Sequence, residues 1–517
     1  MPAPTSAPAG AATAQPVAAL SQQRTIDQLR KLIAARYSLV YLLSWEEARV
    51  EAQLRQLAKS GFSSPLPFYQ WSLTTGLEHE GEKLAGTEQP IAALEAIIRQ
   101  EGPGLFVLKD FHPFLKGDPL VVRKLRDVYQ ALKESVKTVF LLSPLLQIPE
   151  ELVKEISVVD FDLPSYQEME ELFDQMVARL VAAKRLEVQL DPKEKNDLIK
   201  SVLGLTLDEA RQALTKAMVG KRTLDVSAIE TVLEEKRELV RKIGMLEYVP
   251  MEFGVEDIGG MEVLKEWLHK RAGFFTAEAQ KYRLAIPKGV LLTGVSGCGK
   301  SLTVKAIATY WRMPLFRLDV SQVYGGIVGS PEASLRRALK TVEACAPAVL
   351  WIDEIENGVA GYHDGDGGLT GRIFALFLTW MQEKKAPVFV AATANKIDIL
   401  PAEILRKGRF DEVFFVDLPN PSERRQVFEI HLRRRQVPLD GEWDLVYLAK
   451  STEGFNGAEI EQAVISALYD AYAERRALQP SDLYRVISNM VPLSTTMSEQ
   501  IKTIKAWAYK RAVKASR

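Results

Sequence analysis

The sequence predicts an α/β fold in which two similar modules follow one another, each built from a parallel-sheet core and a helical lid. Two observations lead to this prediction. A glycine-rich loop at residues 294–301 lies between an apolar run and a helix-like stretch, the arrangement of a phosphate-binding loop. In addition, motifs of the first half recur in the second half at an offset of about 250 residues, which indicates duplicated domains.

The recurring motifs keep their order and spacing along the chain. They are residues 38–43 with 289–293, 105–110 with 349–353, 138–143 with 388–393, 162–165 with 417–420, and 204–213 with 454–463. Any two α/β domains share strand-like runs, but the preserved order favours duplication. Where the second half has its glycine loop, the first half has Ser44, Trp45, Glu46 and Glu47, with no glycine or lysine. We therefore expect the first half not to bind nucleotide.

Composition and periodicity divide the chain into seven segments. They are an Ala/Pro-rich disordered tail at 1–23, a degenerate α/β domain at 24–165, its small helical lid at 166–222, a linker helix at 223–250, an active core at 251–418, a second helical lid at 419–490, and a basic segment at 491–517. The basic segment could dock on an acidic partner or nucleic acid, or form an amphipathic helix that packs on its own lid.

The phosphate loop fits the pattern GxxxxGK[ST]. Its residues and the one that follows are Gly294, Val295, Ser296, Gly297, Cys298, Gly299, Lys300, Ser301 and Leu302. Glycine lets successive backbone N–H groups turn toward one anion, and the helix that follows adds its partial positive charge. Lys300 would reach the β- and γ-phosphates, and the Ser301 hydroxyl would bind Mg²⁺. The sequence thus predicts a nucleoside triphosphate and Mg²⁺ as ligands.

Two apolar runs of the second half end in polar side chains suited to hydrolysis. Asp353 and Glu354 follow the run at 348–352, and Asn395 follows the run at 388–394. Ligands of parallel sheets gather at such strand ends. We expect Asp353 to bind Mg²⁺, Glu354 to activate the attacking water and Asn395 to orient it. The alternatives are a pair of helix-capping acids and an ordinary turn asparagine.

Two arginines follow the Asn395 run, three residues apart. Planar guanidinium groups stabilise the charge on a transferring phosphoryl group, so Arg406 and Arg409 are candidate catalytic residues. Surface salt bridging is the alternative role.

Bulk composition excludes several classes of protein. The 66 Lys and Arg residues nearly balance the 67 Asp and Glu residues, which argues against a nucleic-acid motor. Only Cys298 and Cys345 are present, too few for a disulfide framework. Cys298 could act as a redox switch or simply be a tolerated small residue. No apolar run is long enough to span a membrane and no secretory signal is visible, so we expect a cytoplasmic or stromal protein.

These motifs together resemble the AAA family of AAA+ ATPases. They are the segment at 255–261, the phosphate loop, the Asp353-Glu354 pair, residues 393–395, the LRKGRFD run at 405–411, and residues 454–458. The whole chain, with its degenerate first half and the ending at 492–497 and 507–511, is similar to the AAA proteins of cyanobacteria and algal plastids known as hypothetical chloroplast open reading frame forty-six.

The resemblance implies two tandem AAA+ modules, the first degenerate, and an ATPase that remodels a protein client. By analogy, the backbone around Ile258 and Gly259 and the ring of His431 would hold adenine. Gly457 and Ala458 would border the adenine pocket, whereas Arg406 and Arg409 would reach the nucleotide of the next subunit of a homo-hexamer. His431 has the alternative of a surface histidine on the helix at 423–434. The closer resemblance suggests a role in regulating photosynthesis or carbon uptake.

One departure from the family pattern concerns the central-pore loop. Family members that thread polypeptide carry an aromatic residue there, but this chain has Ile327, Val328 and Gly329, with Tyr324 upstream. The acidic segment at 362–368 could be a second pore loop or a solvated linker. The alternative function is therefore a slow, ATP-gated regulatory or scaffold protein that does not thread its client.

Overall fold

The computed structural model describes residues 17–242, 245–251, 253–272, 286–319, 331–358, 369–401, 403–404, 406, 408–439 and 443–517. The chain divides into two compact units, residues 1–236 and 237–517, and each is described separately. Helix α8 (Ser227–Arg241) contains the boundary and covers the middle of the stretch at 223–250 where the sequence predicts a linker helix. The end of that stretch instead forms strand β10 (Leu246–Val249), which pairs with β12 (Leu315–Leu318) of the second sheet.

The first unit begins with an α/β domain. Its elements are α1 (Val17–Ala34), β1 (Leu39–Leu43), α2 (Glu47–Ser60), β2 (Phe68–Ser72), β3 (Gly76–His79), β4 (Glu82–Leu84), α3 (Pro90–Arg99), β5 (Gly104–Lys109), η1 (His112–Leu115), α4 (Pro119–Leu132), β6 (Lys137–Ser143), η2 (Glu150–Leu152) and β7 (Ile156–Asp160). Helix α1 begins at Val17, inside the segment predicted as a disordered tail, because residues 17–23 include helix formers such as Ala and Leu.

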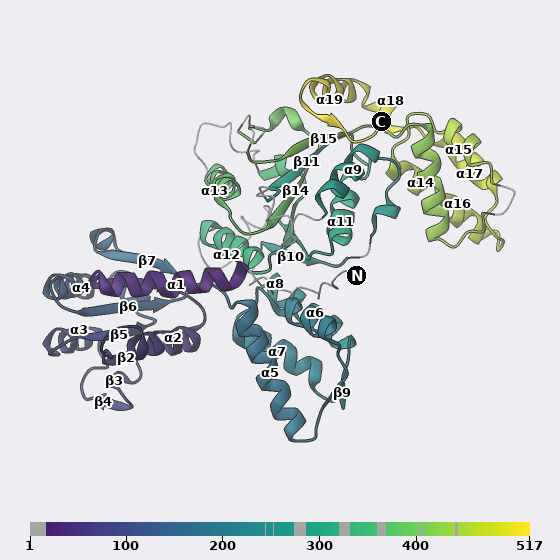
Figure 1. The fold of residues 1–517 in the computed structure, drawn as a ribbon. Helices are drawn as coiled ribbons and strands as arrows, with labels where there is room; N and C mark the ends of the chain where they lie inside the picture. Colours follow the sequence, from purple (N-terminus) through teal and green to yellow (C-terminus); the bar gives the residue numbers. More distant parts are fainter. Residues whose placement is uncertain are drawn as a thin grey trace, which may run out of the picture. The chain divides into compact units, whose positions relative to one another are not determined.

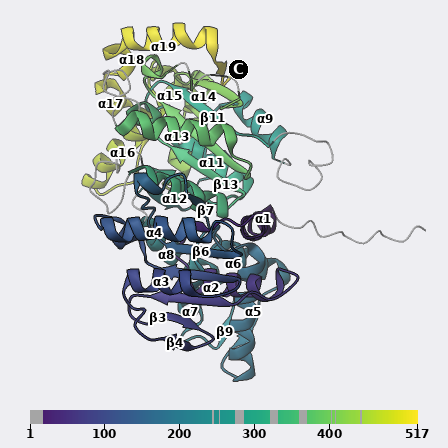
Figure 2. The ribbon, with the colours of Figure 1, turned by 90° about the vertical axis from the view of Figure 1, so that its left-hand side faces the viewer.

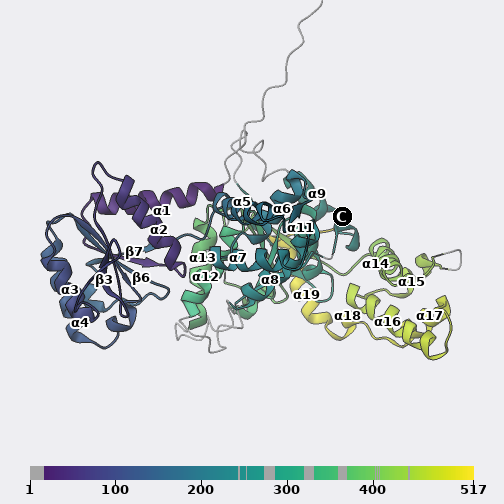
Figure 3. The ribbon, with the colours of Figure 1, turned by 90° about the horizontal axis from the view of Figure 1, so that it is seen from below.

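The first sheet lies between two pairs of helices. Alternate strand residues such as Tyr41 and Leu141 pack with α3 and α4 in one core cluster. Their neighbours Val40 and Leu142 pack with α1 and α2 in another, as the period of two in a strand requires. Figure 3 shows β6 and β7 between the α1–α2 pair and the α3–α4 pair.

A small helical domain follows in the first unit. It contains α5 (Tyr166–Ala182), β8 (Glu187–Val188), α6 (Pro192–Val202), α7 (Leu207–Met218) and β9 (Thr223–Leu224). Capping boxes start three of its helices, with Ser165, Asp191 and Thr206 as the N-cap residues.

The second unit has the same plan. Its core contains β10 (Leu246–Val249), η3 (Val255–Asp257), α9 (Glu262–Arg271), β11 (Gly289–Gly294), α11 (Lys300–Trp311), β12 (Leu315–Leu318), α12 (Pro331–Ala344), β13 (Ala348–Ile352), η5 (Ile355–Gly358), α13 (Leu369–Glu383), β14 (Val388–Ala394), η6 (Ile397–Ile399) and β15 (Glu412–Val416). The helical lid contains α14 (Pro421–Arg434), α15 (Leu445–Ser451), α16 (Gly457–Ala473) and α17 (Pro480–Asn489). The chain continues with α18 (Leu493–Thr496), α19 (Ser498–Arg511) and β16 (Val513–Lys514).

Helices cover both faces of the second sheet. Figure 1 shows α9 and α11 on one side of β11 and β14, with α12 and α13 on the other. Figure 2 agrees, because α13 lies in front of the strands in that view. The α9–α11 face is the main core cluster of this unit, where Leu264 and Ile307 pack against Leu292 and Phe389.

Five parallel strands have the same order in the two sheets. The first reads β4-β3-β2-β5-β6-β1-β7 and the second β10-β12-β13-β14-β11-β15-β16. Pairing is parallel throughout β2-β5-β6-β1-β7 and throughout β12-β13-β14-β11-β15. Numbered in chain order within each unit, both sets of five strands therefore read 2-3-4-1-5. The predicted α/β fold with parallel sheets is confirmed, and the shared order agrees with the recurring motifs.

The basic segment packs differently from the amphipathic helix expected on the lid. Ile501 of α19 is buried in the core cluster formed by α9, α11 and the second sheet, and β16 pairs with β15. Helix α19 therefore covers the α/β core, because strand β16 ties its end to the sheet edge.

Candidate nucleotide-binding site

The glycine loop lies where β11 passes into α11, at the carboxyl end of the sheet. Gly297 and Gly299 have φ values of 77° and 87°, in the left-handed region that favours glycine. A Cβ built on Gly294 would lie 2.0 Å from the carbonyl oxygen of Val416, so this position has no room for a side chain. The backbone thus forms the close turn that the motif predicts.

Lys300 opens helix α11 and its ammonium folds back over the loop. Its Nζ donates hydrogen bonds to the carbonyl oxygens of Gly294 (3.0 Å) and Val295 (2.8 Å). The side chain is buried, and this burial lowers the pKa of Lys300. A phosphate anion beside the ammonium would offset that desolvation.

The Asp353 carboxylate joins three of the strands and helices around the loop. Its Oδ1 accepts hydrogen bonds from Ser301 Oγ (3.0 Å) and from Thr393 Oγ1 (2.7 Å). Its Oδ2 lies 3.6 Å from Nη2 of Arg317, whose guanidinium stacks over Trp351. Ser301 and Asp353, the two predicted metal ligands, are therefore in direct contact. Arg317 and Thr393 were not among the predicted site residues.

Glu354 and Asn395 come together as the strand-end argument predicts. Asn395 Nδ2 donates to Glu354 Oε1 at 2.9 Å, and Asn357 Nδ2 donates to Glu354 Oε2 at 2.9 Å. Glu354 has φ 48°, and its backbone N–H donates to Thr393 Oγ1 at 2.9 Å. The left-handed turn directs the carboxylate along the edge of the sheet, toward the amide of Asn395.

Glu356 is a buried acid that sequence reasoning missed. Its Oε1 accepts the backbone N–H groups of Asn395 (2.8 Å) and Lys396 (3.2 Å), and the residue is only 3% exposed. Burial raises the pKa of Glu356. Its role depends on two backbone donors 39 and 40 residues away, for which the sequence gives no signal.

Residues 257–260 lie along one face of the lid helix α14. A Cβ on Gly259 would lie 2.8 Å from Val427 Cγ2, and Gly260 N–H donates to Gln426 Oε1 at 2.8 Å. In the part of the chain that the structure describes, the N–H of Gly259 meets no hydrogen-bond acceptor. This amide is therefore available to a ligand.

His431 lies one helical turn beyond Val427, on the face of α14 that meets Gly259. Its ring is mostly buried, and Nδ1 lies 3.7 Å from Glu461 Oε1 without a hydrogen bond. Burial lowers the pKa of His431, so the imidazole is held neutral near pH 7. The burial of the ring argues against an ordinary surface histidine, and the contact with adenine stays a prediction.

The lid helix α16 meets the phosphate loop directly. Ala458 N–H donates to Gly297 O at 3.0 Å, and Asn456 Nδ2 donates to Ser296 O at 3.2 Å. A Cβ on Gly457 would lie 3.2 Å from the same Gly297 oxygen. Asn456, the N-cap of α16, lies in the motif at 454–458 but is not among the predicted site residues.

Cys298 is enclosed beneath the loop. It is 8% exposed, and burial raises the pKa of its thiol to about 12. A thiol with this pKa stays protonated at neutral pH and reacts slowly. The geometry favours the tolerated small residue over the redox switch.

Arg406 and Arg409 do not join the other site residues. Arg406 is exposed, and the Arg409 guanidinium donates to the carbonyl oxygen of Glu403. Within the described part of the chain, neither guanidinium group contacts the loop, Asp353 or Glu354. The pore-loop residues Tyr324, Ile327, Val328 and Gly329 and the segment at 362–368 lie outside the described residues.

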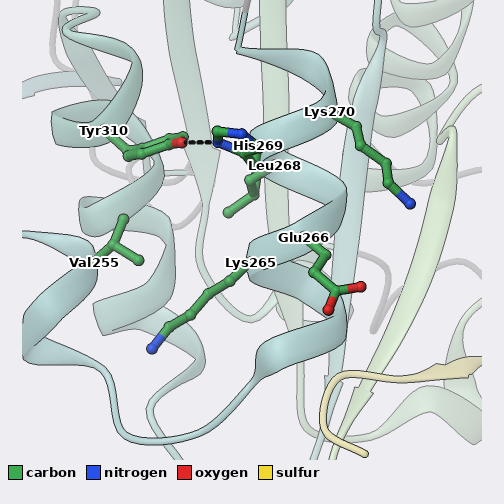
Figure 4. Close-up of a pocket in the computed structure, with 7 residues that line it drawn as sticks. All are labelled: Val255, Lys265, Glu266, Leu268, His269, Lys270 and Tyr310. Atoms are coloured by element: carbon green, nitrogen blue, oxygen red, sulfur yellow. Dashed lines mark hydrogen bonds between the residues drawn. The ribbon is translucent and has the colours of Figure 1, made fainter.

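A cavity of about 390 Å³ lies beside this site, between η3, α9 and α11. It is lined by Val255, Lys265, Glu266, Leu268, His269, Lys270 and Tyr310. Figure 4 shows His269 and Tyr310 joined by a hydrogen bond of 2.7 Å, with Lys265 pointing away from them. Lys265 Nζ donates to the Ile258 carbonyl oxygen at 2.6 Å and so supports the segment that faces α14.

These residues fit Mg²⁺ and a nucleoside triphosphate. The positive φ angles of Gly297 and Gly299 allow the loop to turn backbone N–H groups toward an anion, and Ser301 and Asp353 offer two hard oxygen ligands. No group of three or more His, Cys, Asp or Glu residues could hold a metal ion among those the structure describes. Magnesium would therefore complete its shell with phosphate oxygens and water, as it usually does.

The first unit carries the opposite charges at the corresponding positions. Glu47 opens α2 as Lys300 opens α11, and Lys109 corresponds to Asp353 by strand register. Lys109 Nζ pairs with Glu47 Oε1 at 3.1 Å and with Glu51 Oε2 at 2.7 Å. The residues that follow, Asp110 and Glu354, share φ 48°. The two units thus share a backbone plan, and in the first unit Lys109 pairs with two carboxylates of α2 at the end of β5.

A second ion network joins the helical domain to this place. Arg49 bonds to Glu46 Oε2 at 2.6 Å and to Glu168 Oε1 at 2.9 Å. Leu207 N–H, at the start of α7, donates to Glu46 Oε1 at 2.7 Å. This contact parallels the one between Ala458 and Gly297 in the second unit, with a carboxylate in place of the loop carbonyl.

Three family models match the chain. Residues 290–418 match the ATPase family associated with various cellular activities (AAA). Residues 25–161 match the N-terminal domain of SpoVK-like AAA ATPases, and residues 167–243 match the second domain of that group.

Similar proteins cover nearly the whole chain. The AAA domain-containing protein ycf46 of Pyropia yezoensis is 39% identical over 486 residues, which are 93% of this chain and 97% of that protein. The ycf46 protein of Trieres chinensis is 38% identical over 486 residues, 93% of this chain and 96% of the relative. The ATP-dependent zinc metalloprotease FtsH of Nitrosococcus oceani is 31% identical over 269 residues, 49% of this chain and 41% of FtsH.

Proposed function

The chain belongs to the ycf46 group of AAA family ATPases, and we propose from this that its second unit binds and hydrolyses Mg-ATP in an oligomer that remodels a protein client. One observation carries the proposal. A continuous hydrogen-bonded chain runs from Ser301 through Asp353 and Thr393 to Glu354 and Asn395. These groups are the ones that metal binding and water activation need, held in one network at the end of the sheet.

Each residue has a role that its surroundings support. Lys300 binds the β- and γ-phosphates, and Ser301 and Asp353 hold Mg²⁺, which neutralises the charge of the triphosphate. Glu354 takes the proton of the lytic water, and Asn395 orients that water while Glu356 fixes the backbone of Asn395. Gly259 N–H and His431 face the base, with Gly457 and Ala458 at the rim of the pocket.

Arg406 and Arg409 act in trans in this proposal. Neither guanidinium contacts the described residues of its own phosphate loop, and Arg406 is exposed. An arginine that stabilises the γ-phosphate from a neighbouring subunit would couple hydrolysis to assembly. We propose a homo-hexamer, the ring that the family resemblance implies.

The first unit is proposed to be a degenerate AAA+ module that does not bind nucleotide. The Glu47–Lys109 pair and the Glu46–Arg49–Glu168 network support this, since they fill the positions of the phosphate, the metal and the loop–lid contact. Two carboxylates at the start of α2 would also repel a triphosphate. The unit then serves as a scaffold or adaptor.

Phosphate release from ATP by the purified chain with Mg²⁺ tests the proposal. Glu354→Gln should lose about 10²-fold or more in kcat, because the water loses its base, while ATP binding is retained. Lys300→Ala serves as the binding-deficient comparison. Wild-type protein with no phosphate release above background would end the hydrolase proposal.

The second candidate function is a slow, ATP-gated regulatory or scaffold protein without threading activity. The internal ion pairs of the first unit favour it, as does Ile327 in place of an aromatic pore residue. Pull-downs with Glu354→Gln and ATP discriminate between the two. Capture of a partner without unfolding of a tagged client fits the switch, whereas client unfolding by wild type fits the remodeller.

The location proposed is the cytoplasm, or the plastid stroma if the chain is encoded in a plastid, as the ycf46 relatives support. None of the described helices is long and apolar enough to cross a membrane. Nucleic acid is not proposed as a partner.

A further inference from the structure

Helix α9 receives its N-terminal cap from residues 515 and 516, about 250 positions away in the sequence. The N-cap residue is Met261, which offers no capping side chain. Instead, the N–H groups of Val263 (3.0 Å) and Leu264 (3.2 Å) both donate to the carbonyl oxygen of Ala515. Met261 N–H donates to Ser516 Oγ at 3.2 Å. A helix start normally obtains these acceptors from its own N-cap.

Met261 connects this cap to the candidate nucleotide site. It has φ 58°, a left-handed conformation that is costly for a residue with a Cβ and needs external support. It follows directly after the 258–260 segment, in which Gly259 has its open N–H. Its sulfur accepts a hydrogen bond from Thr303 Oγ1 at 3.3 Å, on the helix that follows the phosphate loop. Met261 thus contacts both the 513–516 segment and the helix that follows the phosphate loop, two residues after Gly259.

The 513–516 segment is itself held on the sheet. Val513 and Lys514 form β16 in parallel register with Phe414 and Phe415 of β15. Ala515 N–H donates to the carbonyl oxygen of Phe415 at 2.9 Å, and Ala515 is 1% exposed. Strand β15 also pairs with β11, the strand that leads into the phosphate loop. The segment thus spans from the sheet edge to the start of α9.

We propose that Ser516 is a positioning residue for adenine, acting through Met261. Held by β16, its hydroxyl fixes Met261 and with it the direction of the Gly259 N–H toward N1 of the base. Guanine carries an N1–H group at this position of the ring, so two donors, this N1–H and the Gly259 N–H, would face each other. Loss of the Ser516 contact therefore lowers the affinity for ATP and the preference for adenine over guanine. This inference rests on the proposed function.

Equilibrium titrations of the full chain test it, in a Glu354→Gln background that prevents turnover. The probes are ATP, GTP and inorganic triphosphate, each with Mg²⁺. Ser516→Ala should weaken ATP binding roughly threefold to tenfold, the effect of one hydrogen bond. The ATP-to-GTP preference should fall by a similar factor, and inorganic triphosphate should bind as in the parent. Ser516→Thr keeps the hydroxyl and should restore the preference.

Lys514→Ala is the matched control, since this exposed side chain lies two residues away on the same segment. It should behave as the parent. Unchanged ATP affinity in Ser516→Ala would overturn the inference. An equal loss of affinity for ATP, GTP and inorganic triphosphate would also overturn it, because a residue with a merely structural role would weaken the binding of all three. A parent that binds no ATP would instead refute the proposed function.

Hydrogen exchange on the unsubstituted chain gives a second measurement that needs no stable variant. Coupling between two sites is reciprocal, so bound ATP should stabilise the docked 513–516 segment. Peptides that cover residues 261–264 and 513–517 should exchange more slowly with ATP than without it. Slower exchange at the phosphate loop alone would contradict the coupling.

Discussion

At the scale of single residues, hydrogen bonds between side chains position the residues of the site. Asp353, Glu354 and Asn395 could be predicted because each directly follows an apolar run, and parallel strands end at one edge of a sheet. Glu356 and Arg317 could not be predicted, since their partners are a pair of backbone N–H groups and a carboxylate that only the fold brings near. Residues that act through the backbone leave no motif.

Glu356 gives a prediction at this scale. Glu356→Ala should lower kcat about tenfold or more with little change in KM for ATP, because Asn395 loses the acceptor that fixes its backbone. Steady-state phosphate release measures both constants. Asn357→Ala is a comparison variant, since Asn357 donates to Glu354 Oε2 and leaves the Asn395 backbone untouched, so its effect on kcat reports on Glu354 alone. A rise in KM with unchanged kcat would show that Glu356 serves binding instead.

Cys298 gives a second prediction. Because burial raises the pKa of its thiol to about 12, the thiolate is nearly absent at pH 7–8. Native protein should therefore resist alkylation at Cys298 by iodoacetamide, and unfolded protein should react readily. Mass spectrometry of the tryptic peptide measures the labelled fraction. Fast labelling of Cys298 in the native state would restore the redox-switch interpretation.

At the scale of elements, some helices and strands are specified by neighbouring residues, and others depend on residues far away in the sequence. A contiguous sequence motif forms the glycine turn before α11, so the position of this turn could be predicted to the residue. The cap of α9 could not be predicted, because its acceptor is the backbone carbonyl oxygen of Ala515 and every residue type has such an oxygen. The position of the basic segment also depends on backbone pairing. One expectation places its helix on the lid, whereas β16 pairs with β15 and α19 lies on the core.

The ion network of the first unit gives a prediction about elements. Arg49 is buried between Glu46 and Glu168, whose side chains are 7% and 17% exposed. Arg49→Met should leave both carboxylates unpaired and destabilise the first unit by about 3–5 kcal/mol. Urea unfolding of the full chain, followed by Trp71 and other tryptophans, measures the change.

The matched control for that variant is Arg55→Met. Arg55 pairs with Glu51 on the same helix but is about half exposed, so its loss should cost less than about 1 kcal/mol. ATP affinity should be unchanged in both variants if the second unit alone binds nucleotide. Reduced ATP binding in Arg49→Met would show that the first unit takes part in the site.

At the scale of the whole molecule, two sheets with the same order of five parallel strands carry different residues at the ends of corresponding strands. Both sheets read 2-3-4-1-5, yet Lys109 and Glu47 stand where Asp353 and Lys300 stand. In the proposal, the changed charges and the missing glycine loop abolish phosphate binding in the first unit while the strand order is kept. The repeated motifs predicted the duplication. The ion pairs could not be predicted, since Lys109 pairs with Glu47 and Glu51, which lie 62 and 58 positions earlier in the sequence.

The central claim is that a triphosphate is cleaved where two second units meet, with Arg409 supplied by the neighbour. The most direct test mixes Lys300→Ala with Arg409→Ala, each inactive alone, and measures phosphate release after co-assembly is shown by sizing. In a randomly mixed equimolar ring, about a quarter of the interfaces join an intact phosphate loop to an intact Arg409, so turnover should return to roughly that fraction of wild type. Co-assembled rings that release no phosphate would contradict the claim.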